Sequence, residues 1–273
     1  MQLFGTDGIR GRLASSPSDD VAAIEALFSH REISPRLFRL IGEGLGAMME
    51  HGTEVVIGWD QRPGNSALVS ALTQGFHHRG IVVIWAGEVA TPGLQASMLH
   101  QGAVMGCMVT ASHNPVTDSG IKVFDQYGYK SMPEYEAQVS DIIVQLASEE
   151  REVDEPELLR LAIPDSEFDG GSVHREVLEQ RFSLFENCFA DNAGSHPGGD
   201  VSSLPDEGLA IDASGGSAER WLVDWLNTKG IDAHAVASPV AMNANCGAGE
   251  FSPSDKWTWE QLQSYTGEHL LLI

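Results

Sequence analysis

The sequence predicts an α/β fold in which mostly parallel sheets are flanked by helices. In the first half of the chain, short apolar runs rich in β-forming residues alternate with amphipathic segments, which is typical of parallel strands joined by crossover helices. The 273 residues are 42% hydrophobic and 20% charged, so the chain has enough aliphatic residues for a packed core. At roughly 100–200 residues per domain, this length indicates two domains.

The first 150 residues contain the clearest pattern of alternating elements. We expect helices over 35–50, 65–78, 91–100 and from 131 through Leu146, and strands over 54–59, 81–85, 103–109 and 120–124. Asn65 or Ser66 is expected to cap the second helix, and Ser131 with Glu134 has the spacing of a capping box at the start of the fourth.

The composition changes after the fourth helix. Residues 149–157 are acidic and are expected to be solvated, and 190–207 are rich in Gly, Pro, Ser and Asp, which indicates an interdomain linker. We therefore expect one domain over 1–189 and the start of another over 208–273. The second is expected to contain strands at 209–212, 232–236 and 269–273 and helices at 218–228 and 257–265.

The charge and the cysteines exclude some classes of partner and setting. The formal net charge is −23 and no basic patch interrupts it, which argues against a nucleic-acid partner. No run of about 18 apolar residues and no basic amino-terminal region occurs, so we expect neither a membrane partner nor a secretory signal. Cys107, Cys188 and Cys246 form no CxxC pair. Their wide spacing favours a reducing, cytoplasmic setting.

The segment Thr110–Pro115 (TASHNP) has the most informative chemistry, because it follows a buried strand at the sheet edge where open α/β sheets bind ligands. No GxSxG elbow surrounds Ser112. If the segment is extended, His113 points to the opposite face and is poorly placed to be its base. A hydroxyl without a base would suit phosphoryl transfer. A polar turn closed by Asn-Pro explains the same residues.

Two further segments carry candidate cations. Gly5–Gly11 surrounds Arg10 with glycines, so that backbone N–H groups and a guanidinium could approach an anion, although a flexible tail with an incidental Arg explains it too. Lys122 lies in a short apolar strand, where its amine either has a function or snorkels to solvent. The loop Asp60–Gly64 also follows a strand and is equally ambiguous. The glycines of 42–46 lie within a helical pattern and are not a dinucleotide fingerprint.

Taken together, five segments resemble the α-D-phosphohexomutase family and occur in the family's order. They are FGTDGIRG at 4–11, GWDQRPGN around Arg62, TASHNP at 110–115, DSGIKVF at 118–124 and NANCGA at 243–248. The resemblance covers essentially the whole chain, apart from an atypical stretch at 14–33, the acidic segment and a long linker. The opening LFGTDGIRG is most similar to the bacterial phosphoglucosamine mutase branch of the family.

The resemblance implies a phosphoserine mechanism. It implies that Ser112 carries a phosphate that is also one ligand of Mg²⁺, and that Arg10, His113 and Lys122 contact phosphate or substrate. The substrate implied is a phosphorylated hexosamine or hexose, with a hexose bisphosphate as activator. The reaction implied is interconversion of glucosamine 6-phosphate and glucosamine 1-phosphate through a bisphosphate intermediate, on the route to cell-wall sugar nucleotides.

The carboxyl-terminal end departs from the family pattern. The DGDxDR loop that supplies the other metal ligands in the family does not occur in the 273 residues. We therefore expect one complete mutase-type domain and part of a second, and a chain that by itself is inactive as a mutase. Phosphomannomutase or phosphoglucomutase specificity, and a non-catalytic phosphosugar-binding protein, remain as alternatives.

Overall fold

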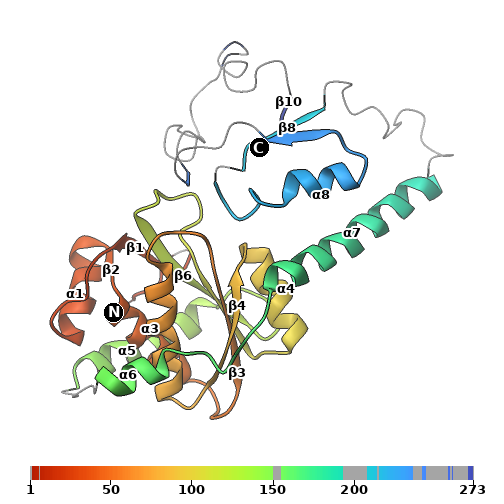
Figure 1. Ribbon diagram of the computed structural model, residues 1–273. Coiled ribbons are helices and arrows are strands. Elements are labelled where there is room, and N and C mark those ends of the chain that lie inside the picture. Colours follow the sequence, from red (N-terminus) through yellow and green to blue (C-terminus); the bar gives the residue numbers. More distant parts are fainter. Residues whose placement is uncertain are drawn as a thin grey trace. The chain divides into compact units, whose positions relative to one another are not determined.

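The computed structural model describes residues 2–5, 7–149, 155–192, 208–213, 215–235, 242–243, 258, 260 and 270–272 (Figure 1). The chain divides into two compact units, Met1–Arg175 and Glu176–Ile273. The division falls inside helix α7 (Gly170–Asn192). The expected linker lies mostly outside the described residues, so the domain boundaries that we expect stay a prediction. No helix in the described ranges is long and apolar enough to span a bilayer.

The first unit is built on a sheet of seven strands in the order β2-β1-β6-β5-β3-β4-β7. The strands are β1 (Ile9–Leu13), β2 (Glu32–Ile33), β3 (Glu54–Trp59), β4 (Val82–Glu88), β5 (Met105–Val109), β6 (Asp118–Asp125) and β7 (Ser166–Glu167). β6 runs antiparallel to β1 and β5, and every other neighbouring pair is parallel. The predicted fold class, a mostly parallel sheet flanked by helices, is confirmed.

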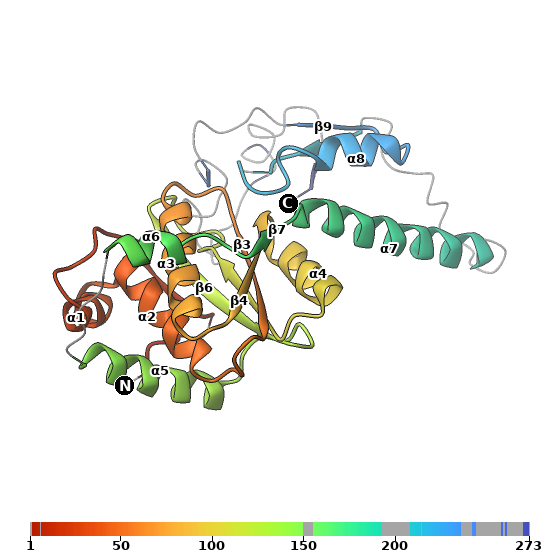
Figure 2. The ribbon, with the colours of Figure 1, turned by 60° about the horizontal axis from the view of Figure 1, so that its bottom comes forward.

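Helices cover both faces of this sheet (Figure 2). They are α1 (Asp20–His30), α2 (Pro35–Gly46), α3 (Asn65–His78), α4 (Thr91–Gln101), α5 (Pro133–Ala147) and α6 (Glu155–Leu161). The larger hydrophobic cluster joins α1, α2, α3 and α5 to one face, and a smaller one joins α4 to the other. Val55 and Ile57 of β3 belong to the first cluster and Val56 to the second, because successive side chains of a strand point to opposite faces.

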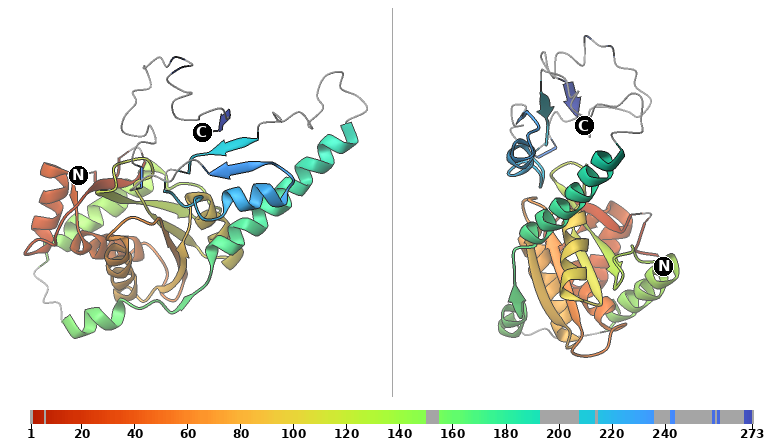
Figure 3. Two further views of the ribbon diagram at one scale, coloured as in Figure 1. Left: turned by 45° about the horizontal axis from the view of Figure 1, so that its top comes forward. Right: turned by 90° about the vertical axis from the view of Figure 1, so that its right-hand side faces the viewer.

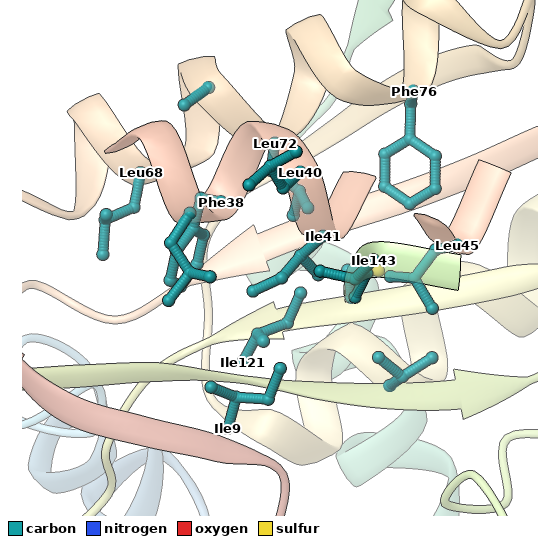
Figure 4. Packing of buried hydrophobic residues seen from close by; sticks show 14 of the residues in the cluster. Ile9, Phe38, Leu40, Ile41, Leu45, Leu68, Leu72, Phe76, Ile121 and Ile143 are labelled. Carbon is teal, nitrogen blue, oxygen red and sulfur yellow. The ribbon is translucent and has the colours of Figure 1, made fainter. Parts of the chain in front are cut away.

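Glycines allow α2 and α3 to pack closely. A Cβ added to Gly75 of α3 would lie 2.1 Å from the Arg39 carbonyl oxygen, and one added to Gly42 of α2 would lie 2.4 Å from the Leu72 oxygen. Figure 4 shows Leu40 and Leu72, one from each helix, close together in the core. The glycines at 42–46 thus serve helix packing, which explains why they lie inside a helical pattern.

Three local expectations are wrong. α3 begins at Asn65, but its N-cap is Gly64 with φ of 86° and no side chain caps it, because the Asn65 amide is used elsewhere in the core. The capping box at 131–134 does not form, because α5 begins at Pro133 and the Ser131 hydroxyl donates instead to Glu136. α2 ends at Gly46 rather than at 50, and Ala47 is its C-cap.

The stretch at 14–33 contains an unexpected helix, α1, and ends with the edge strand β2. Asp19 caps α1 by accepting a hydrogen bond from Ala22 N. The buried Arg39 guanidinium contacts Asp20 at 2.6 Å and also pairs with Glu43 on its own helix. This ionic contact fixes α1 against α2. The expected solvated segment 149–157 lies largely outside the described residues, and α6 begins at Glu155.

The second unit has a small parallel sheet in the order β10-β8-β9. Its elements are β8 (Leu209–Ile211), α8 (Leu222–Thr228), β9 (Ala233–Ala235) and β10 (Leu270–Leu272), at the strand positions expected from the sequence. Figure 3 shows α8 alongside the β8–β9 pair, and Leu222 and Leu226 pack on Leu209 and Ile211. The expected helix at 257–265 and the loop at 243–248 fall mostly outside the described residues.

We predict that Gly75→Ala destabilises the first unit by about 1–3 kcal/mol, because the added methyl group would clash with the α2 backbone. Urea denaturation followed by circular dichroism would measure the change. Ser66→Ala, an exposed position on the same helix, is the control and should stay within about 0.5 kcal/mol of the parent. A Gly75→Ala chain as stable as the parent would contradict the close packing of α2 and α3.

Candidate active site

The loop after β5 presents Ser112 at the carboxyl-terminal edge of the strand. Ser112 has φ of 55°, and its N–H donates to the Thr110 hydroxyl at 2.9 Å. A non-glycine residue rarely adopts this left-handed backbone, and such strain persists only where the surroundings hold it. The loop is therefore not extended at Ser112, contrary to our expectation.

Lys122 lies directly beside the Ser112 hydroxyl. It belongs to β6, where its Cα pairs with that of Met108 on β5. Its Nζ donates to Ser112 Oγ at 3.1 Å and lies 3.4 Å from Asp7 Oδ2. The side chain is only 13% exposed. The amine of Lys122 is thus directed into the loop cluster rather than toward solvent.

Arg10 approaches the same loop from β1, where it pairs with Gly120 of β6. Its Nη1 donates to Asn114 Oδ1 at 3.4 Å and its Nη2 forms an ion pair with Asp7. Its Nε is buried and has no hydrogen-bond partner within the described ranges. The segment that carries Arg10 is therefore part of the sheet and not a free tail, and its guanidinium keeps a donor available.

Asp7 lies between the cations. Burial would raise the pKa of this carboxyl group, but the positive charges of Lys122 and Arg10 outweigh it and lower the pKa below the ordinary value. Lys130 Nζ lies 3.8 Å from the other carboxylate oxygen. Asp7 is therefore ionised at neutral pH. Its carboxylate pairs with the cations, Lys122 and Arg10, that would contact a phosphate group on Ser112.

Gly8 allows this segment to approach β6. Its φ is 91°, and a Cβ there would lie 2.1 Å from the Ile121 carbonyl oxygen. Only glycine fits both the conformation and the space. The glycines that surround Arg10 in the sequence thus have a structural role that brings the guanidinium to the loop.

Arg62, which was not among the predicted site residues, holds the Ser112 loop in place. Its side chain is fully buried, and its Nε donates to Asp60 Oδ2 at 3.0 Å. Its two Nη groups donate to four backbone carbonyls of the loop, namely Pro115 at 2.6 Å, Asp118 at 2.9 Å, Asn114 at 3.1 Å and Ser112. The guanidinium therefore fixes the path of the chain on both sides of Ser112.

Asp60 connects Arg62 to the rest of the loop. Its Oδ2 accepts a hydrogen bond from the Thr110 hydroxyl at 2.5 Å, and its Oδ1 accepts one from the Asn65 amide at 2.7 Å. Asn65 in turn accepts from the buried Ser119 hydroxyl at 2.6 Å. These side chains come from the ends of β3 and β5, the start of α3 and the start of β6, so they join four elements at one edge of the sheet.

His113 takes no part in this network. It is exposed, and none of the hydrogen bonds between described residues involves it. The Ser112 hydroxyl thus lies beside the Lys122 cation, and His113 is not bonded to it as the base of a hydrolase nucleophile would be.

The described residues do not fit a complete Mg²⁺ site. No three side chains of His, Cys, Asp or Glu cluster within them, and the Ser112 hydroxyl faces the Lys122 ammonium group. Mg²⁺ requires an octahedron of oxygen ligands. A phosphate on Ser112 would supply one ligand.

Comparison with known proteins identifies the family of the chain. Residues 1–150 match the family model described as phosphoglucomutase/phosphomannomutase, alpha/beta/alpha domain I. The chain belongs to this family. The match contains Arg10, the Arg62 loop, Ser112 and Lys122, so the network described above lies entirely within the residues that match the domain I model.

Curated relatives of this family member are bacterial phosphoglucosamine mutases. The protein from Bacillus mycoides is 29% identical over 259 residues, which is 92% of this chain and 49% of the relative. The protein from Parasynechococcus marenigrum is 40% identical over 136 residues, which is 50% of this chain and 26% of the relative. The chain spans about half the length of the Bacillus relative that it matches.

Solved structures share the fold. A putative phosphomannomutase from Thermus thermophilus aligns with a TM-score of 0.57 and 24% identity, over 89% of this chain and 47% of that one. A phosphoglucomutase from Paramecium, also named parafusin, aligns with a TM-score of 0.55 and 15% identity, over 84% of this chain and 41% of that one. At these identities the likeness concerns the fold.

We predict that Arg62→Lys loosens the Ser112 loop, because an ammonium group cannot reach Asp60 and four carbonyls together. Amide hydrogen exchange of 110–118 should become at least about tenfold faster, which corresponds to the loss of one or two hydrogen bonds. Arg12→Lys, at an arginine that is 65% exposed on β1, is the control and should leave this exchange unchanged. Equal exchange in both variants would show that Arg62 does not hold the loop.

Proposed function

We propose that Ser112 carries the phosphoryl group of a phosphoglucosamine mutase reaction, which interconverts glucosamine 6-phosphate and glucosamine 1-phosphate. The observation that carries this proposal is the position of the Ser112 hydroxyl, 3.1 Å from Lys122 Nζ in a loop that a buried arginine holds. The mutase activity is proposed for a protein of the relatives' full length. This chain matches about half of the Bacillus mycoides relative.

The chemistry follows from a phosphate on Ser112. The free hydroxyl of the phosphosugar attacks the phosphorus atom, the bond between phosphorus and Ser112 Oγ breaks, and the proton of the sugar hydroxyl passes to the serine oxygen, which gives a sugar bisphosphate and a free serine. After the bisphosphate turns over, Ser112 Oγ attacks its other phosphorus atom, the bond between that phosphorus and the sugar oxygen breaks, and the serine proton passes to the sugar oxygen. Each transfer moves one phosphoryl group between two oxygens, so serine phosphate is restored at the end of each cycle.

Lys122 and Arg10 would neutralise the charge of the transferring group. Preorganised cations stabilise a phosphoryl-transfer transition state without reorganisation. The ammonium group of Lys122 already contacts the oxygen that leaves and attacks. The buried Nε of Arg10 offers a further donor, and the exposed position of His113 suits contact with the sugar phosphate.

Several finer points belong to the same proposal. Mg²⁺ dependence, activation by a hexose bisphosphate and a cytoplasmic location are proposed from the family resemblance, and no step is derived through the metal. Phosphomannomutase or phosphoglucomutase specificity is the alternative for the sugar, since the matching family model carries both names. The alternative for the activity is a role in binding a phosphosugar without turnover. This alternative is kept because no three His, Cys, Asp or Glu side chains cluster among the described residues.

Incubation of the purified chain with glucose 1,6-bisphosphate should place one phosphate on Ser112, detected by intact mass and peptide mapping. Ser112→Ala should abolish the transfer without loss of stability, because a loop hydroxyl contributes little to folding. Thr117→Ala removes an exposed hydroxyl from the same loop and should keep the transfer. Phosphorylation at another residue, or undiminished transfer in Ser112→Ala, would refute the assignment.

A further inference from the structure

A cavity lies at the sheet edge opposite Ser112. Ser112 follows the carboxyl end of β5, whereas this cavity includes Met105 at the amino end of that strand. Its volume is about 570 Å³, which falls within the range of ligand pockets in proteins. The walls come from the turn after α2, the start of β5, the end of β6 with the turn that follows it, and Tyr135 of α5.

The cavity is lined mainly by soft and aromatic side chains. Four of the eight methionines of the chain line it, namely Met48, Met49, Met105 and Met132, together with Phe124, Tyr127 and Tyr135. Thioethers adapt to the shape of a ligand and make favourable contacts with aromatic rings. This concentration of methionine and aromatic residues favours a ligand with a flat apolar body.

The rim of the cavity exposes apolar residues to solvent. Met48 and Val104 are each 37% exposed, Met132 is 64% and Tyr127 is 68% exposed. Single exposed apolar residues are ordinary, but a group that surrounds one hollow marks a binding surface. The arrangement is therefore open to a ligand from solution.

The charged residues that line the cavity determine which ligand charge it favours. Glu50 and Asp125 line it, and no Lys, Arg or His stands among the described residues that line it. The Tyr135 hydroxyl has no hydrogen bond to any described residue, and burial raises its pKa, so it stays protonated as a donor or acceptor. Carboxylates attract a cation and repel a phosphosugar, and the electron-rich rings of Tyr127 and Tyr135 also favour a cation.

We infer that this cavity binds a small organic cation with an aromatic body, such as an arylalkylamine, at a site separate from Ser112. The carboxylates and the tyrosine rings would contact the ammonium group, and the methionines would enclose the ring. The inference does not depend on the proposed mutase function, because none of the residues that line the cavity belongs to the Ser112 network.

Three matched probes test the charge preference in isothermal titration of the purified chain. Tryptamine is cationic at pH 7, tryptophol is neutral, and indole-3-acetate is anionic, while all three share the indole ring. Tryptamine should bind roughly five- to tenfold more tightly than tryptophol, and indole-3-acetate should bind least. Excess glucosamine 6-phosphate should not displace tryptamine. Equal binding of all three probes, or displacement by the phosphosugar, would overturn the inference.

Matched variants locate the site. Val104→Trp should fill the mouth of the cavity and weaken tryptamine binding at least about tenfold, whereas Val21→Trp, at a 47% exposed position of α1, should not change it. Glu50→Gln should weaken binding roughly threefold, and Glu25→Gln, also exposed but outside the cavity, should not.

Analytical ultracentrifugation distinguishes another occupant of the same surface. If the chain self-associates and Val104→Trp abolishes association while tryptamine does not bind, the cavity is an interface between copies of the chain, and the inference is wrong. A monomer that binds tryptamine with the expected variant pattern supports it.

Discussion

The buried ion pair between Arg62 and Asp60 is the interaction on which the geometry of the candidate active site depends. A fully buried guanidinium must satisfy its five N–H groups, and here Asp60 and four backbone carbonyls of the loop do so. Those carbonyls are paired at the same time, and the left-handed backbone at Ser112 is held by bonds on both sides. The hydrogen bonds that satisfy the buried charge of Arg62 therefore also hold the strained backbone at Ser112.

The direction of β6 completes the arrangement. Because β6 returns antiparallel to β5 after the loop, Lys122 lies opposite Met108, near the end of β5 from which the loop departs. β1 then pairs antiparallel with β6 and brings Arg10 to the same edge. Lys122 thereby contacts the Ser112 hydroxyl, and Arg10 contacts Asn114 of the same loop, in a protein whose net charge is −23. Local placement of positive charge within an acidic chain is what a phosphate-carrying serine requires.

The sequence predicts those features that repeat along the chain, and it misses those that depend on distant partners. The helix at 65–78 and the strand at 54–59 coincide with α3 and β3, because their apolar periodicity and their glycine boundaries are local. α1 was missed because its anchor, the contact of Asp20 with Arg39, joins residues 19 positions apart. Arg62 was noted in an ambiguous loop and in a family segment but was given no role, since its carbonyl acceptors lie 50 to 56 residues away and backbone groups leave no pattern in a sequence.

The guanidinium protons of Arg62 report directly whether this side chain holds the Ser112 loop. In a chain labelled with ¹⁵N-arginine, NMR spectra report whether each guanidinium group rotates freely or is held by acceptors. If Arg62 is held as described, its two Nη groups should give separate, slowly exchanging proton signals, which should be absent from the spectrum of Arg62→Lys. A single averaged signal like that of the exposed Arg12 would contradict the account, because it would show that the Ser112 loop is not fixed by this side chain.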